Sequence, residues 1–236
     1  MSGHSKWKTN KAKKSATDAK KGALYTKIIK ELTAIAREGG GNPDTNSRLR
    51  AVIAKAKEAN MPSDNIKTAI MRGTGELPGV SYETVMYEAY GPAGVAILIE
   101  ALTDNKNRTT AELRNIIAKK GANMAGAGAV SWMFSKKGYF LIEKGKIKEE
   151  DLMSVALDSG AEDFKSDEKN YEIITSPQDF EKVKIALQER GFIWQDAEVT
   201  MIPSSTIKVT GNDAKQLLAL IDALEEHDDV QQVYAN

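Results

Sequence analysis

The chain of 236 residues has no cysteine, two histidines and an aromatic content of 6%. The absence of cysteine excludes disulfide bonds, thiol nucleophiles and cysteine zinc sites, and it fits a reducing compartment. The two histidines, His4 and His227, lie near opposite ends of the sequence. No Ser–His–Asp set or histidine-based metal site is therefore expected, and we predict a protein that is not an enzyme and needs no metal or cofactor.

Long hydrophobic runs are also missing. The longest unbroken run near the middle of the chain extends from Ala93 to Ile99, far short of the roughly 20 residues that a transmembrane helix needs. The N-terminus is charged, but no apolar segment of a secretory signal follows it. We therefore expect a cytoplasmic protein without a membrane partner.

What the chain does have is a strongly uneven distribution of charge. It carries 33 basic and 33 acidic residues in total, but residues 1–75 hold 16 basic and 6 acidic side chains, a net charge of +10. Residues 76–236 hold the other 17 and 27, a net charge of −10. This division indicates that the N-terminal end binds a polyanion and that the rest has a different task.

The N-terminal end is expected to be a basic arm, residues 1–22, followed by a domain of three helices, residues 23–78. Apolar residues recur at helical spacing in two of these helices, at Leu24, Ile28, Leu32 and Ile35 and at Leu49, Ile53 and Ala56. Asn46 or Ser47 is the expected N-cap of the second helix, and Ser63 that of the third. The second and third helices resemble a helix-turn-helix in outline, although a simple three-helix bundle with a charged face fits equally well.

Beyond residue 80 the pattern changes to strands alternating with helices, which predicts an α+β fold. Residues 135–204 follow the order β-α-β-β-α-β of a ferredoxin-like domain. Strands are expected at 82–90, 95–102 and 130–134, with a helix at 109–120; a strand at 206–209, a helix at 213–226 and a strand at 230–234 follow the ferredoxin-like stretch. The outer segments, 79–134 and 205–236, would form a second ferredoxin-like domain into which the first is inserted.

The basic residues of the arm and of the first two helices are the candidate nucleic-acid contacts. Lysines neutralise phosphates without reading sequence, and Trp7 could stack on an unpaired base. The alternative is a solvated tail that aids solubility. The candidates are Lys6, Trp7, Lys8, Lys11, Lys13, Lys14, Lys20, Lys21, Lys27 and Lys30 in the arm and first helix, and Arg48, Arg50, Lys55 and Lys57 in the second helix.

A second candidate is the polar loop from Asn105 to Thr109, which contains Lys106 and Arg108 and leads into a predicted helix. Backbone N–H groups at a helix N-terminus favour anions, so the loop could hold phosphate. It could equally serve only as a cap, through Asn107 or Thr109.

An acidic region follows at residues 149–168, which include Glu149, Glu150, Asp151, Asp158, Glu162, Asp163, Asp167 and Glu168. Nothing in the sequence indicates that these carboxylates converge on a Mg²⁺ ion. They are expected to form a solvated face or a surface for a basic protein partner. The chain is expected to be a monomer or a weak oligomer.

Several longer strings carry a family resemblance. They are residues 2–7 (SGHSKW), 36–43 (AREGGGNP), 55–62 (KAKEANMP), 72–75 (RGTG), 90–92 (YGP), 102–109 (LTDNKNRT) and 130–134 (VSWMF). Together these strings resemble the YebC/PmpR family of probable transcriptional regulatory proteins, which also includes a mitochondrial translational activator of cytochrome c oxidase subunit I. Residues 125–129 (AGAGA) lack the Thr or Ser usual in the family's Gly-rich run before the last string.

The resemblance implies a helical N-terminal domain, two α/β domains and a cytoplasmic role in gene expression without catalysis. It implies a DNA-binding transcriptional regulator. The alternative is a ribosome-associated translation factor that binds ribosomal RNA and assists synthesis of difficult sequences, such as proline-rich ones. The sequence does not choose between these two functions.

Overall fold

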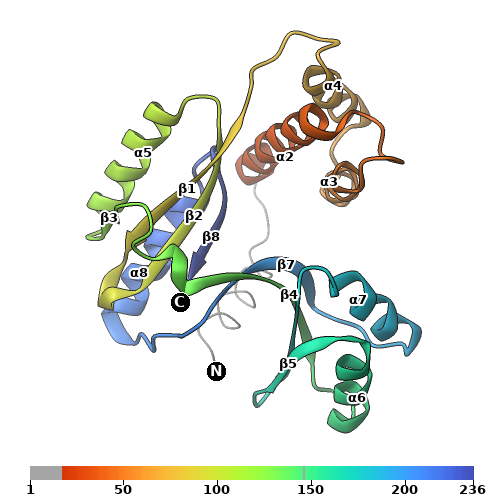
Figure 1. Ribbon diagram of the computed structural model, residues 1–236. Helices are drawn as coiled ribbons and strands as arrows, with labels where there is room; N and C mark the ends of the chain where they lie inside the picture. The colour runs from red at the N-terminus through yellow and green to blue at the C-terminus, as the bar shows by residue number, and fades with distance from the viewer. Residues whose placement is uncertain (1–17, 146) are drawn as a thin grey trace. The chain divides into compact units, whose positions relative to one another are not determined.

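A computed structural model describes residues 18–145 and 147–236, with side chains described from residue 21 onward. Contacts divide the described residues into two compact units. One unit contains residues 131–208 together with Asn236, and the other contains the residues up to Val130 and those from Val209 to Ala235. Figure 1 shows the elements of both units.

Three helices begin the larger unit: α2 (Asp18–Gly39), α3 (Ser47–Glu58) and α4 (Ser63–Thr74). Their apolar faces form one buried core, which includes Ile28, Leu32, Leu49, Ala56 and Ala69. The predicted helical periodicity is confirmed at Ile28, Leu32, Leu49 and Ala56, whereas Leu24 is 39% exposed. Helix α2 starts at Asp18, so the last five residues of the predicted arm are helical.

The helix caps agree with the predictions in part. Asn46 is the N-cap of α3, and its side chain accepts a hydrogen bond from the backbone N–H of Leu49. The prediction that Ser63 caps α4 is wrong: the N-cap is Pro62, with no side-chain bond. Helix α4 approaches α2 closely at Gly73, where an added Cβ would lie 2.5 Å from the carbonyl oxygen of Thr33.

Sheet A of the same unit contains β1 (Glu83–Tyr90), β2 (Ala96–Thr103), β3 (Asn123–Ala125) and β8 (Val230–Ala235) in the order β3-β1-β2-β8. All three pairs of neighbouring strands are antiparallel. A short 3₁₀ turn, η1 (Pro92–Gly94), connects β1 to β2. Helices α5 (Lys106–Lys119) and α8 (Gly211–Glu225) complete the layer of sheet and helices. Strand β2, buried along almost its whole length, is the centre of this core.

Two strand predictions in this region are wrong. Residues 206–209 form no strand, since both edges of β2 are already paired, with β1 and with β8. Residues 131–133 form a 3₁₀ helix, η2 (Ser131–Met133), and the third strand is the short β3 instead. The backbone N–H of Val130, at the start of the predicted strand, donates to the carboxylate of Glu88 instead of to a neighbouring strand, and the N–H of Gly128 donates to the same carboxylate.

The smaller unit has the predicted β-α-β-β-α-β order. Its elements are β4 (Phe134–Glu143), α6 (Glu149–Ser159), β5 (Ala161–Ser166), β6 (Asn170–Thr175), α7 (Phe180–Glu189) and β7 (Asp196–Pro203). The antiparallel sheet B has the order β5-β6-β4-β7, which is the ferredoxin-like arrangement. Its helices cover one face through a core that contains Phe140, Ile173, Phe180 and Leu187.

Sheet A has the same arrangement of strands in space, but the chain enters it at a different strand. Its first strand, β1, occupies the position that β6, the third strand of the smaller unit, occupies in sheet B. The predicted α+β fold, a helical segment followed by two α/β layers, is therefore confirmed, with the strands of sheet A reassigned. Among the described residues, no helix is long and apolar enough to span a membrane.

Candidate nucleic-acid interface

Most of the predicted basic arm lies outside the described residues. This applies to Lys6, Trp7, Lys8, Lys11, Lys13 and Lys14, and to the side chain of Lys20. Lys21 is the first of the predicted cations whose side chain is described, and it lies exposed near the start of α2.

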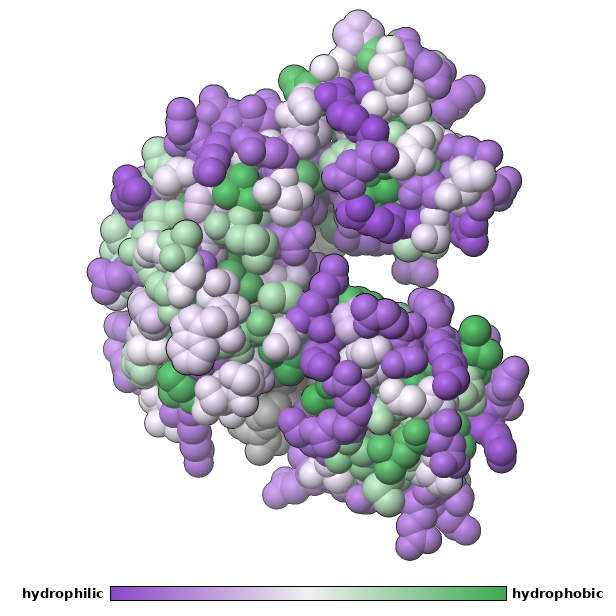
Figure 2. All heavy atoms as spheres, in the orientation of Figure 1, coloured by the Kyte–Doolittle hydropathy of each residue, from purple (hydrophilic) through white to green (hydrophobic). Residues whose placement is uncertain are grey.

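The predicted cations of α3 are exposed, and three of them, Arg48, Arg50 and Lys55, are bonded to neighbouring groups. Arg48 forms an ion pair with Glu38 at 2.8 Å, and Lys55 with Glu31 at 2.9 Å. Arg50 donates to two backbone carbonyl groups, of Pro43 and Asp44. Ion pairs this exposed contribute little stability, so an incoming phosphate can compete for these cations. Hydrophilic residues cover most of the visible surface of the three helices (Figure 2).

Lys27 has a different environment. Its ammonium group donates to the carbonyl oxygen of Glu225 at 2.5 Å, at the last residue of α8. The last carbonyl groups of a helix have no partner within the helix and carry partial negative charge, so a lysine is favourable there. Lys27 therefore serves as a cap that connects α2 to α8.

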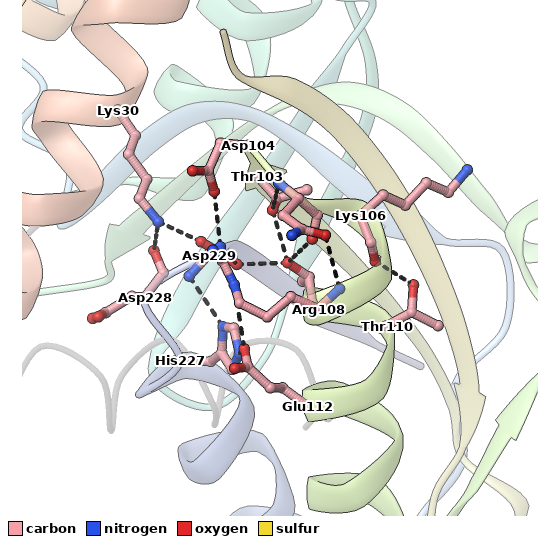
Figure 3. Close-up of polar contacts among 12 residues, drawn as sticks. Lys30, Thr103, Asp104, Lys106, Arg108, Thr110, Glu112, His227, Asp228 and Asp229 are labelled. Carbon is pink, nitrogen blue, oxygen red and sulfur yellow. Dashed lines mark hydrogen bonds and ion pairs between the residues drawn. The ribbon is translucent and has the colours of Figure 1, made fainter. Parts of the chain in front are cut away.

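The polar loop before α5 is organised by Asn105. Asn105 is the N-cap of the helix, and its side chain accepts the backbone N–H of Arg108 at 3.1 Å. The prediction that Asn107 or Thr109 is the cap is therefore wrong. The exposed side chain of Lys106 points away from the neighbouring polar contacts, whereas Arg108 turns toward Asp229 (Figure 3).

Asp229 is the centre of a polar cluster that the sequence analysis missed. Its side chain is only 2% exposed. One carboxylate oxygen forms an ion pair with Lys30 of α2. The other accepts a hydrogen bond from Arg108 at 2.9 Å and from the hydroxyl of Thr109 at 2.6 Å. Arg108 also contacts Asp104 at 2.8 Å, so its guanidinium group lies between two carboxylates (Figure 3).

The pKa values follow from this geometry. Burial alone would raise the pKa of the Asp229 carboxyl, but the hydrogen bonds from Lys30, Thr109 and Arg108 outweigh it and hold that pKa well below its usual range. The same bonds to Asp229 and Asp104 raise the pKa of Arg108. Asp229 and Arg108 are therefore both ionised at neutral pH, and the cluster joins α2 to the start of α5 and of β8.

Within the described part of the chain, one group of potential ligand side chains lies close enough together to hold a metal ion. It consists of Glu112, His227 and Asp229. His227 Nδ1 accepts the backbone N–H of Asp229 at 3.0 Å, which leaves the ring proton on Nε2 facing Glu112 at 2.9 Å. Asp229 is already occupied by Lys30 and Arg108, two cations that oppose a third positive charge. The group therefore fits a hydrogen-bonded cluster better than a metal centre.

The remaining candidates do not converge. Helix α4, the position of a recognition helix in a helix-turn-helix, begins with Ser63, Asp64 and Asn65 and carries just two basic groups, Lys67 and Arg72. On α6 the acidic residues Glu149, Glu150 and Asp151 lie in the first turn, where negative charge suits the helix dipole. The acidic region is thus explained in part by helix stability.

Taken together, the fold and these contacts define a class: a three-helix segment and two α/β layers, with a basic end and a buried ionic cluster. The model of the TACO1/YebC protein N-terminal domain matches residues 5–76, and the model of the TACO1/YebC second and third domain matches residues 82–236. The chain belongs to the TACO1/YebC family.

The relatives agree over the full length. A probable transcriptional regulatory protein of Dictyoglomus turgidum is 54% identical, with 100% of this chain and 95% of that protein covered. One of Geobacter sulfurreducens is 52% identical, with the same coverage. The crystal structure of the conserved hypothetical protein Aq1575 from Aquifex aeolicus is similar with a TM-score of 0.80 at 44% identity, covering 95% of this chain and 93% of that one.

Proposed function

We propose that the protein is a non-enzymatic regulator of gene expression that binds nucleic acid through the phosphate backbone with its N-terminal end. The observation that carries the proposal is the net charge of +10 on residues 1–75 against −10 on the rest. Such a distribution favours binding of a polyanion at the N-terminal end. The names of the relatives support the regulatory role, and we place it in the cytoplasm.

The phosphate contacts in this proposal are the arm lysines, Lys21, the α3 cations and Lys106. They are exposed where the structure describes them, and the α3 ion pairs are weak enough to exchange for phosphate. Lys27 and Arg108 are left out, because their charged groups already bind the end of α8 and Asp229.

The first candidate target is duplex DNA, as expected of a transcriptional regulator. The second candidate is ribosomal RNA, and the composition of α4 favours it. A recognition helix presents side chains that read base edges in the major groove. Helix α4 instead has a carboxylate, Asp64, in its first turn and carries two cations, so duplex binding by this domain would be mostly independent of sequence.

Binding to duplex DNA and to purified ribosomes at physiological salt tests the proposal. The wild type is compared with a variant in which Lys13→Glu and Lys14→Glu reverse two arm charges, which avoids truncating α2. A transcriptional regulator should prefer one promoter over random duplex by roughly a thousandfold or more. Equal, salt-sensitive binding to every duplex beside stable ribosome association would reject the transcriptional role, and binding to neither would reject the proposal.

A further inference from the structure

Trp132 is the most exposed aromatic side chain of the described residues, at 73%. It lies in η2, between Val130 and Phe134, which are 0% and 6% exposed. Large aromatic side chains contribute strongly to cores when they are buried. The fold therefore keeps an indole at the surface while it buries Val130 and Phe134, two positions away on either side.

The chain before Trp132 is fixed by side-chain bonds. The buried carboxylate of Glu88 accepts the backbone N–H groups of Gly128 at 2.7 Å and Val130 at 2.5 Å. The hydroxyl of Tyr90 donates to the carbonyl oxygen of Ala129 at 3.1 Å. These bonds hold the Gly-rich loop, and they also satisfy the negative charge of Glu88.

The chain after Trp132 is fixed by sheet B. The carbonyl oxygen of Met133 accepts the backbone N–H of Ser204 at 2.8 Å, and Phe134 pairs with Pro203 in the β4–β7 ladder. Because the backbone on each side is ordered by folding, little further ordering of the main chain is needed when a ligand contacts the indole.

The charge around this turn differs from that of the rest of the acidic half. From Ser131 to Ile142 the chain has no carboxylate, and it carries two cations, Lys136 and Lys137. Residues 199–212, which include the partner segment of the turn, contain Lys208 and no acidic residue. Lys136 and Lys208 are exposed, whereas Lys137 forms an ion pair with Glu162 at 2.6 Å.

We propose that Trp132 is a stacking platform for an unpaired base of single-stranded nucleic acid, with Lys136 and Lys208 supplying attraction to its phosphates. Base–aromatic stacking beside cations is the recurring chemistry of such sites. A tryptophan that anchors a protein interface normally lies in an apolar surrounding. Here the turn is followed by serine and lysine, at Ser135 and Lys136. The inference rests on the proposed function and adds a site in the acidic half of the chain.

The test uses the full chain with Trp7→Phe and Trp194→Phe, so that Trp132 is the one remaining tryptophan. The probes are an oligouridine of about ten nucleotides, within the usual site size for such proteins, and an RNA duplex of equal length. Oligouridine should quench the Trp132 emission, and the duplex should not.

Substitutions of Trp132 then test whether its aromatic ring contributes to binding. In the wild-type background, Trp132→Ala should weaken oligouridine binding by roughly tenfold, while Trp132→Phe keeps most of the affinity because the ring can still stack. Ile193→Ala, which removes an apolar side chain that is 81% exposed in the same unit, is the matched control and should change nothing.

Three results would overturn the inference. They are unchanged emission on oligouridine binding, wild-type affinity in Trp132→Ala, and an equal loss of duplex and oligouridine binding in that variant. The first two would leave the exposed indole to a protein partner. All three results can occur while the wild type still binds nucleic acid in a salt-dependent way. A failure of the proposed function differs from them, because the wild type would then bind no nucleic acid at all.

Discussion

The cations that bind Asp229 have surroundings opposite to those of Lys136 and Lys208, which lie in the two segments that meet at the Trp132 turn. Lys30 and Arg108 bind a buried carboxylate, and their charge serves to join α2 to α5 and β8. Lys136 and Lys208 are exposed, in segments without carboxylates. The comparison teaches that a cation bound by a buried carboxylate stabilises the fold, whereas a cation at the exposed surface stays available to an external anion.

The largest expected effect comes from removing the shared anion. Asp229→Ala leaves Lys30 and Arg108 without their buried partner, and it should lower the free energy of unfolding by about 3–5 kcal/mol. Urea denaturation followed by circular dichroism measures the loss. The control is Glu38→Ala, which removes the exposed partner of Arg48 and should cost less than about 1 kcal/mol. Equal losses in the two variants would contradict the contrast between buried and exposed pairs.

The next effect concerns the turn that carries Trp132. Glu88→Ala leaves the buried N–H groups of Gly128 and Val130 without an acceptor, at a cost of about 1–3 kcal/mol each. Amide hydrogen exchange at these two residues should become faster. Glu83→Ala, at an exposed position of the same strand, is the control and should leave both amides protected. Unchanged exchange in Glu88→Ala would mean that the loop is held by other contacts.

A smaller effect is expected on the dependence of stability on pH. The pKa of Asp229 is lower in the folded than in the unfolded chain, so folding favours the ionised form. Asp229 contributes its full stabilisation above its pKa in the unfolded chain, about 4. This stabilisation is lost as the pH falls from that value toward the lower pKa of Asp229 in the folded chain. The difference in unfolding free energy between the wild type and Asp229→Asn should therefore be constant near neutrality and shrink below about pH 4. A difference that grows on acidification would refute the assignment.

The smallest effect is on the salt dependence of nucleic-acid binding. Lys136→Gln should reduce the slope of log affinity against log salt by about one, as expected when one phosphate-binding cation is removed. Arg108→Gln should leave the slope unchanged, since its guanidinium group is bound by Asp229 and Asp104. Titrations with oligouridine over a series of salt concentrations measure both slopes. A smaller slope in Arg108→Gln, with an unchanged slope in Lys136→Gln, would mean that Arg108 and not Lys136 binds phosphate.

The sequence predicted the elements that depend on local periodicity. The core faces of α2 and α3 follow from apolar residues at helical spacing, and the strand order of sheet B follows from the β-α-β-β-α-β pattern. It missed β3, which has three residues and no alternation to detect. It also placed a strand at residues 206–209, because local propensity does not show that both edges of β2 are already paired.

The candidate site was less predictable. Asn105, Lys106 and Arg108 were identified from the loop, but the partners of Arg108 and Lys30 were not. Asp229 lies 121 residues from Arg108 and 199 from Lys30 in the sequence, and no local pattern connects them. An aspartate directly before an apolar strand, in the string Asp228-Asp229-Val230, was the one available signal. The domain boundaries and the arm contacts remain predictions.

The central claim is that the basic N-terminal end binds nucleic acid through phosphates. The most direct test is the salt slope of binding for the wild type and for the double variant Lys13→Glu and Lys14→Glu. We expect the variant to bind more weakly and its slope to flatten by about two, because two phosphate-binding lysines are replaced. Weaker binding with an unchanged slope, or no change in either quantity, would contradict the claim.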